Sequence, residues 1–278
     1  MLTINPKEIE ITKLHHYLLG AIGPRPIAFA STIDVNGIPN LSPFSFFNVF
    51  SANPPILVFS PARSGRTGAT KNTFDNVKAT KEVVINVVNF DIVQQMSLSS
   101  SPYDASIDEF IKSGLTPIPS ETIQPFRVKE SPVQFECKVN EIIELGQNGG
   151  AGNLVICEVL RIHINEKVLD EKRMIDQHKI DLVSRMGGNW YCRADKNSMF
   201  EIQKPLTTIG IGVDQIPRAI RNSSILSGND LGLLGSIEVL PTAQEITNYD
   251  APKGERHQVA KDLLAKGETI NAWKVLLK

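Results

Sequence analysis

Residues 26–50 read PIAFASTIDVNGIPNLSPFSFFNVF and give the clearest indication of the fold. Over residues 26–33, large apolar side chains fall on one parity and small or hydroxyl side chains on the other. This pattern predicts a strand with apolar groups on both faces, as expected near a barrel core. Asn36-Gly37 then predicts a hairpin with a type I′ turn, in which both central residues need positive φ. The chain returns as one element from Ile38 to Phe50.

Short strand-like runs continue beyond this hairpin, separated by turns and by short helical segments. Strands are expected at 56–60, 82–88, 132–145 and 154–168, and a Gly-rich loop, 146–152, joins the last two as a hairpin. Helices are expected at 72–80, capped by Thr70 or Asn72, at 91–99, capped by Asp91, and as one turn at 107–112. This order favours a mainly β, antiparallel barrel with peripheral helices.

The character of the chain changes after residue 200, where helix-like segments replace strands. Helix starts are expected at Asp214 and at Asn229-Asp230, and residues 256–278 predict one or two terminal helices. We therefore predict a barrel domain over residues 1–204 and a partly helical C-terminal extension over 205–278 that packs on the barrel. The extension could cover a binding site or build a subunit interface, and the sequence leaves both open.

Composition excludes several classes of protein. The chain has 278 residues, 29 Lys and Arg against 30 Asp and Glu, and a net charge of −1, so no overall field attracts nucleic acid or membrane. The three cysteines include no CxxC pair, and Cys137 and Cys157 lie in strand-like runs as small core residues. No signal peptide and no apolar run of about 18 residues is found, which predicts a cytoplasmic protein without membrane contact. No hydrolase, metalloprotease or Walker motif is present.

Hydroxyl and cationic side chains gather around the first strands. A phosphate monoester needs such a group, because it carries about −1.5 to −2 charges and several strong acceptor oxygens. A helix start near residue 72 would add aligned backbone amides. The alternative is a solvated polar loop. The group consists of Ser31, Thr32, Ser42, Ser45, Ser60, Arg63, Ser64, Arg66, Thr67, Lys71, Asn72 and Thr73.

Four phenylalanines, at 44, 46, 47 and 50, stand beside Ser45 and Asn48 in LSPFSFFNVF. A flat tricyclic ring needs apolar walls and a few fixed polar groups at one edge. The alternative is a core strand with a bulge at Pro43.

Taken together, ASTIDVNGIPNLSPFSFFN, PPILVFS, KNTFDN, YDASIDEFIKSGLTPIPS, SPVQFECKV, VICEVLRIHINEKVL and RMGGNWY strongly resemble the flavin-reductase-like, FMN-binding split-barrel family, which includes flavoredoxin. The resemblance covers about residues 15–200. It implies a six-stranded, antiparallel, Greek-key-like split barrel that forms a homodimer and holds FMN near the subunit interface.

The resemblance also implies roles for particular residues. Ser31 and Thr32 would lie near the flavin phosphate or ribityl chain, and Ser60 at the next strand end. Lys71, Asn72 and Thr73 match the family's Lys-Asp-Thr phosphate segment, with Asn72 in place of Asp. The ring would be lined by Ser45, Phe46, Phe47 and Asn48. Arg66 joins the cofactor-binding set, as does Arg185 of RMGGNWY, for which a structural salt bridge is the alternative. His163 is expected to be a hydrogen-bonded barrel residue.

Three functions fit this family. In the first, an oxidoreductase, NAD(P)H passes hydride to bound FMN, which needs no catalytic acid or base from the protein. In the second, the chain is a non-enzymatic, flavoredoxin-type electron carrier that a redox partner protein reduces. In the third, it only stores or senses flavin.

Overall fold

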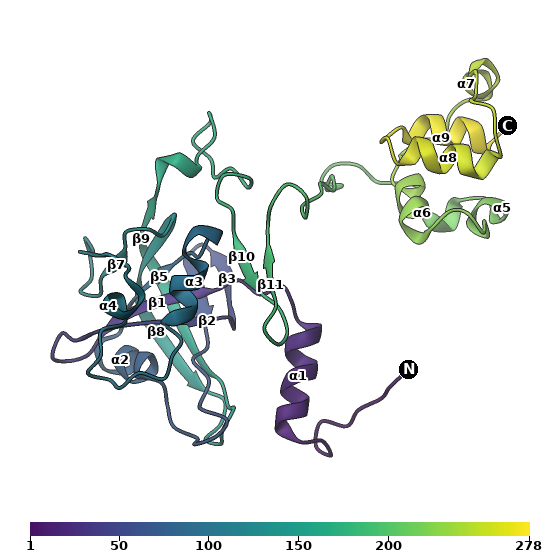
Figure 1. Cartoon of the computed structure of the whole chain (residues 1–278). Coiled ribbons are helices and arrows are strands. Elements are labelled where there is room, and N and C mark those ends of the chain that lie inside the picture. The colour runs from purple at the N-terminus through teal and green to yellow at the C-terminus, as the bar shows by residue number, and fades with distance from the viewer. The chain divides into compact units, whose positions relative to one another are not determined.

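The computed structural model describes residues 1–278 and divides the chain into two compact units, residues 1–200 and 201–278 (Figure 1). The boundary predicted from the sequence, between residues 204 and 205, lies slightly further along the chain. The first unit contains every strand and helices α1–α4, and the second contains only helices. Packing of the second unit on the barrel stays a prediction.

One antiparallel sheet forms the first unit, in the strand order β2-β1-β5-β8-β9-β4-β3. Two short hairpins stand outside it, β6 (Pro117–Ile118) with β7 (Arg127–Val128), and β10 (Val183–Arg185) with β11 (Tyr191–Arg193). The strands of the sheet are β1 (Ala28–Ile33), β2 (Pro39–Phe44), β3 (Phe47–Ala52), β4 (Pro55–Phe59), β5 (Glu82–Asn86), β8 (Val133–Glu144) and β9 (Asn153–Ile164).

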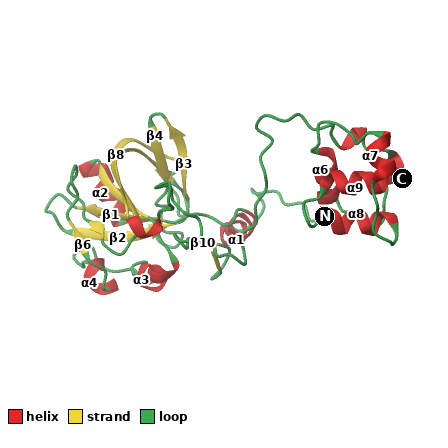
Figure 2. Ribbon diagram, turned by 90° about the horizontal axis from the view of Figure 1, so that it is seen from above, coloured by secondary structure: helices red, strands yellow, loops and turns green.

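The sheet must curl into a barrel because its two outermost strands are consecutive in the chain. β2 ends at Phe44 and β3 begins at Phe47, so two residues connect opposite edges of the sheet. The rings of Phe44 and Phe59 meet with centroids 5.7 Å apart, and Figure 2 shows the curled strands. No ladder joins β2 to β3, so the barrel is split at this point. The predicted antiparallel split barrel is confirmed.

The main sheet has seven strands where the family resemblance implied a six-stranded barrel. The difference arises at residues 38–50, which were expected to return as one element but form β2 and β3. The chain breaks between them at Ser45 and Phe46, where the Phe46 carbonyl accepts a hydrogen bond from the Ser60 amide at 2.8 Å. The first half of the segment therefore pairs with β1 and the second with β4.

The two faces of β1 enter two different cores, as the alternation in PIAFASTI predicts. Ala28 and Ala30 belong to the barrel core with Phe59 and Ile85. Ile27 and Phe29 belong to an outer core with Phe110 and other residues of the covering helices. A strand with two buried faces carries apolar side chains on both parities.

The hairpin after β1 differs from the predicted type I′ turn. Gly37 has φ +82°, but Asn36 is not among the residues with positive φ. The Asp34 carboxylate explains the difference, because one of its oxygens accepts from the amides of both Asn36 and Ile38 at 2.8 Å. An aspartate that bonds its own following backbone favours this alternative turn.

Four helices belong to the first unit, and their caps differ in part from the expected ones. The N-cap of α2 is Lys71, without a side-chain cap bond, so neither Thr70 nor Asn72 is the cap. Asp91 lies inside a 3₁₀ helix, Phe90–Ile92, and does not cap α3. The helices are α1 (Ile11–Ala21), α2 (Asn72–Thr80), α3 (Val93–Leu98) and α4 (Glu109–Ser113).

The second unit has its own hydrophobic core around Trp273, which is fully buried and donates its indole N–H to the Leu234 carbonyl at 2.9 Å. Ser227 caps α6, so Asp230 lies in the first turn of that helix. Asp214 lies in a 3₁₀ helix, Val213–Gln215. The helices are α5 (Arg218–Arg221), α6 (Gly228–Gly235), α7 (Ala243–Asn248), α8 (Arg256–Leu264) and α9 (Thr269–Leu276). Residues 256–278, expected to form one or two helices, form two, α8 and α9.

Candidate functional site

A cavity of about 250 Å³ lies beside β2, between the start of α2 and the segment 99–103. Arg66 and Lys71 are its cations, and neither has a carboxylate partner within salt-bridge distance. The cavity brings together four of the predicted site residues, Arg66, Lys71, Asn72 and Thr73. Hydroxyls make up most of the remaining polar lining, which comprises Asn40, Ser42, Ser64, Thr67, Thr70, Ser99, Ser100, Ser101, Tyr103 and Glu109.

The loop that carries Arg66 is held by backbone bonds and by its neighbour Arg63. The Ser64 amide donates to the Ala69 carbonyl at 2.9 Å. The Arg63 guanidinium donates to Glu144 at 3.0 Å and to Gln147 at 2.9 Å, at the end of the β8–β9 hairpin. The charge of Arg63 is therefore balanced by Glu144, whereas the charge of Arg66 is not.

The first turn of α2 faces the same cavity. No side chain caps this helix, and Thr70, which could do so, donates its hydroxyl to Asp75 at 3.0 Å instead. Uncapped first-turn amides and the positive end of the helix dipole favour an anion. Asn72 and Thr73 are the first two helical residues, so their amides supply part of the donor set.

A buried carboxylate, Glu109, orders the cavity wall. It is 3% exposed and accepts from the Asn40 side chain and the Leu41 amide, both at 3.0 Å. Asn40 in turn accepts the Thr73 hydroxyl at 2.7 Å. Burial raises the pKa of Glu109 above its ordinary value, although these hydrogen bonds oppose the shift. The hydroxyl of Thr73 is thus committed to Asn40.

A second cavity, of about 150 Å³, adjoins the first and shares Ser100 with it. The predicted residues Ser45 and Arg185 both line it, with Tyr191. The Arg185 guanidinium lies 4.7 Å from the centre of the Tyr191 ring and donates to the Trp190 carbonyl at 3.3 Å. Arg185 has no carboxylate partner, so the alternative of a structural salt bridge is wrong. The rest of the lining is Ile27, Pro43 and Met96.

The other predicted hydroxyls line neither cavity. Ser31 is fully buried, and its hydroxyl has no hydrogen-bond partner. Thr32 is buried and accepts from the Asn76 side chain at 3.1 Å. Ser60 accepts from the Asn153 amide at 3.0 Å, which fixes the start of β9 to the end of β4.

The predicted ring residues after Ser45 also lie outside both cavities. Phe46 is 41% exposed, Asn48 is exposed, and Phe47 packs partly against the barrel core. Sequence reasoning missed the segment 99–103 and Glu109. The run Ser99-Ser100-Ser101 could have indicated the former, because it repeats the hydroxyl-rich composition of the loop before α2.

Other polar features of the barrel have structural partners. His163 Nε2 lies 2.8 Å from the fully buried Glu136 carboxylate, as a hydrogen-bonded barrel histidine should. Cys137 and Cys157 are buried in the barrel core, as predicted. No group of three or more potential ligand side chains is placed to hold a metal ion. The helices include none with both the length and the apolar character needed to cross a membrane.

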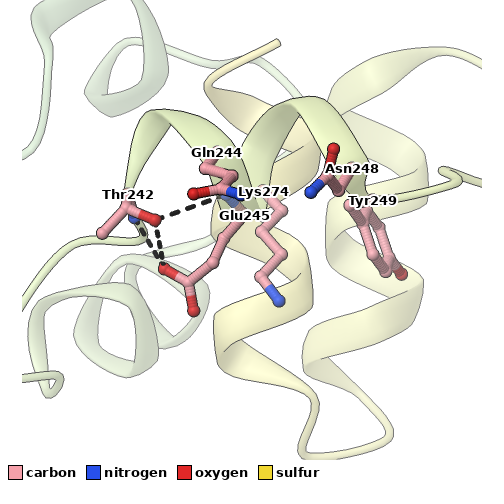
Figure 3. Close-up of a pocket in the computed structure, with 6 residues that line it drawn as sticks. All are labelled: Thr242, Gln244, Glu245, Asn248, Tyr249 and Lys274. Atoms are coloured by element: carbon pink, nitrogen blue, oxygen red, sulfur yellow. Dashed lines mark hydrogen bonds between the residues drawn. The ribbon is translucent and has the colours of Figure 1, made fainter.

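A further cavity, of about 400 Å³, lies within the C-terminal unit (Figure 3). Several of its polar groups already have partners in the protein, and it has one cation and one carboxylate, so no unpaired pair of cations faces it. Thr242 and Glu245 bond each other's backbone and side chain in a capping box, and Lys274 lies 5.6 Å from the centre of the Tyr249 ring. This cavity is therefore not the candidate site.

The fold and the two adjoining cavities define a split-barrel protein with a cationic, hydroxyl-rich site. A family model, "Flavin reductase like domain", matches residues 21–181. This span is more than half of the chain, and the protein therefore belongs to the flavin-reductase-like family. Membership supports a flavin-related redox function.

Three solved structures resemble the chain closely. Nitrilotriacetate monooxygenase component B from Bacillus cereus is 31% identical, with a TM-score of 0.68 over 73% of this chain and 98% of that one. The 2-nitrobenzoate 2-nitroreductase NbaA from Pseudomonas fluorescens is 26% identical, with a TM-score of 0.67 over 76% and 100%. A split-barrel protein from Shewanella frigidimarina NCIMB 400 is 27% identical, with a TM-score of 0.61 over 73% and 100%.

Proposed function

We propose that the chain binds FMN, with the phosphate in the larger cavity. The observation that carries this proposal is the pair of cations, Arg66 and Lys71, that line a hydroxyl-rich cavity without carboxylate partners. A phosphate monoester suits such a donor set, because charged hydrogen bonds to its oxygens are short and strong. The uncapped start of α2 adds backbone amides to it.

The smaller cavity would receive the near edge of the flavin ring. It adjoins the phosphate cavity at Ser100, so one elongated ligand could reach both. Ile27 and Met96 offer apolar walls, and Ser45 and Arg185 offer polar groups, the combination that flat cofactors require. Phe46, Phe47 and Asn48 stay proposed ring contacts, Ser31 and Thr32 proposed phosphate or ribityl contacts, and Ser60 a proposed cofactor contact at the next strand end.

The first test is the absorbance spectrum of the purified protein and the identity of the flavin released by heat. A yellow protein that releases about one FMN per chain is expected. Release of FAD would show that the cofactor is FAD and not FMN, and the proposed site would stand. A colourless protein that takes up no FMN on titration would overturn the proposal.

We further propose that the protein is an oxidoreductase that takes hydride from NAD(P)H. The bound flavin would supply the redox chemistry, and the protein would bind and orient it and exclude water. One similar structure belongs to a nitroreductase, an enzyme that reduces a small molecule. Another is component B of a monooxygenase, which is consistent with passing electrons to a further component.

The runner-up is a non-enzymatic, flavoredoxin-type carrier that a redox partner protein reduces. Stopped-flow mixing with NADH or NADPH separates the two. Rapid bleaching of the flavin band supports the reductase. No bleaching, while dithionite still reduces the flavin, supports the carrier and overturns the NAD(P)H proposal.

A homodimer in the cytoplasm is also part of the proposal. Several apolar side chains of β3 and β9 are exposed in the single chain, including Val49, Phe50 at 68%, Leu160 and Ile162. A second copy that covered them would remove their apolar surface from water, which favours association. Light scattering at several protein concentrations measures the oligomeric state, and a monomer at all of them would refute the proposed homodimer.

A further inference from the structure

The arginines of the barrel unit fall into two groups. Five of the eight lie within salt-bridge distance of a carboxylate, namely Arg63, Arg127, Arg161, Arg173 and Arg193. The three without such a partner are Arg25, Arg66 and Arg185. Arg66 lines the proposed phosphate cavity. Arg25 and Arg185 are neighbours, so their two charges form a second positive centre that no carboxylate of the chain neutralises.

Backbone hydrogen bonds fix Arg25 and Arg185 side by side. Each amide donates to the other's carbonyl, at 2.9 and 2.8 Å. Arg25 is 6% exposed, and its guanidinium donates to the carbonyls of Leu19, Ile22 and Met186. These bonds tie the C-terminal end of α1 to the β10–β11 hairpin, beside which it lies (Figures 1 and 2).

The charge of Arg25 is only partly offset in this position. Helix C-terminal carbonyls attract cations, but they carry partial charge alone. The Nε atom of Arg25 is buried without a hydrogen-bond partner. Burial lowers the pKa of Arg25, and the nearby charge of Arg185 lowers it further. An anionic group in the adjoining cavity would relieve this repulsion.

Arg185 is the member of the pair that can reach a ligand. It lines the smaller cavity with Ser45 and Ser100, and its guanidinium lies over the Tyr191 ring. Ser100 also lines the phosphate cavity. A ligand whose phosphate lies near Arg66 and Lys71 would therefore bring its other end toward Arg185.

We propose that Arg185, positioned by Arg25, stabilises the negative charge of the reduced flavin ring. This rests on the proposed FMN binding. Two-electron reduction of flavin takes up one proton to give an anion, FMN + 2e⁻ + H⁺ → FMNH⁻, or two protons to give the neutral form. A nearby cation favours the charged form, so Arg185 raises the reduction potential and lowers the proton uptake.

The test compares the two-electron reduction potentials of bound FMN in the wild type and in Arg185→Gln over pH 6 to 9. We expect the variant to lose about tenfold in affinity for reduced relative to oxidised FMN, a potential lower by about 30 mV. With one proton per two electrons, the wild-type potential should change by about 30 mV per pH unit near neutrality. In Arg185→Gln, the slope of about 60 mV per pH unit that marks uptake of two protons should extend to higher pH than in the wild type.

Two further variants separate charge from structure. Arg185→Lys keeps the charge and should retain most of the potential. Arg161→Gln removes a cation that pairs with Glu121 on the surface and should leave the potential unchanged. Circular dichroism of each variant identifies any that fail to fold, and if Arg185→Gln does, Arg185→Ala takes its place as the variant without the charge.

The outcomes distinguish a failure of the role of Arg185 from a failure of the proposed FMN binding. If neither the wild type nor any variant binds FMN, the proposed function is wrong. If all bind FMN and Arg185→Gln keeps the wild-type potential and slope, the inference is wrong and the function stands. A change confined to the KM for NADPH or NADH would likewise overturn it, because Arg185 would then bind the nucleotide.

Discussion

Replacing Lys71 by alanine should weaken FMN binding while leaving the protein folded. Lys71 precedes α2 with φ −94° and ψ 146°, an extended conformation that alanine adopts without strain. Its carbonyl, which accepts from the Phe74 and Asp75 amides at 2.8 and 3.1 Å, is unchanged by the substitution. The side chain is exposed and has no carboxylate partner. The substitution therefore removes one ammonium group from the cavity and little else.

The expected loss follows from the kind of contact. A hydrogen bond to a charged group contributes about 1.5–3 kcal/mol, which corresponds to roughly 10- to 150-fold in Kd. Because the lysine is exposed, solvent and salt screen the interaction, and the lower end of this range is expected. The difference between wild type and variant should shrink as the salt concentration rises.

The assay is titration of the cofactor-free protein with FMN, followed by flavin fluorescence. Lys78→Ala is the matched control, since Lys78 is an exposed lysine of the same helix that pairs with Glu144 and does not line the cavity. An unchanged Kd for Lys71→Ala, or an equal loss in Lys78→Ala, would refute the assignment of the phosphate to this cavity.

Three further predictions concern stability and loop position. Burial alone would raise the pKa of Glu136, but hydrogen bonds, the largest from the Thr122 hydroxyl, hold this pKa at about 2 against an ordinary 4.5. The stability that the carboxylate contributes is therefore full above pH 4.5 and lost as the pH falls toward 2. Glu136→Gln should lower the free energy of unfolding by roughly 3 kcal/mol at pH 7 and flatten its acid dependence, as urea unfolding at several pH values would show. Trp273→Ala should lower the free energy of unfolding of the C-terminal unit by about 3–5 kcal/mol and leave the amount of flavin released by heat unchanged. A loss of flavin in this variant would contradict that expectation and show that the C-terminal unit supports the site. A Cβ on Gly149 would lie 2.9 Å from the Gly65 carbonyl oxygen, so Gly149→Ala should displace the loop of Arg66 and weaken FMN binding several-fold in titration. Gly65→Ala, whose Cβ meets open space, should leave the free energy of unfolding within about 0.5 kcal/mol of wild type.

Local pattern was enough to predict most strands. The alternation in residues 26–33 indicated two buried faces, and both cores are present. It was not enough for residues 38–50, because a run of phenylalanines is compatible with one strand or with two. The break at Ser45 and Phe46 depends on pairing with β1 on one side and β4 on the other, which no local signal records. The turn at Asn36 similarly depended on the carboxylate of Asp34.

Helix α1 had no signal strong enough to predict it. Its residues are all exposed or half-buried, so no apolar stripe had to face a core. Arg25 holds its C-terminal end, through bonds to the carbonyls of Leu19 and Ile22 that appear only in three dimensions.

For the site, residue chemistry and tertiary structure made different contributions. Composition and family resemblance selected Arg66, Lys71, Asn72 and Thr73, and the structure places all four around one cavity; that this cavity binds phosphate stays a proposal. The chain's folding decided that Arg63, an equally plausible cation, is neutralised by Glu144. It also decided that residues 99–103 complete the cavity.

The sequence by itself determined the class of protein, because its motifs, in their order and spacing, resemble the flavin-reductase-like family and its strand patterns are local. Only the tertiary structure decided which charges remain free. Whether an arginine has a carboxylate within 4 Å depends on side chains brought together from distant parts of the chain, as Arg25 and Arg185 show. The electrostatic free energy of a group depends on those distances and on burial, and neither is written in the order of residues.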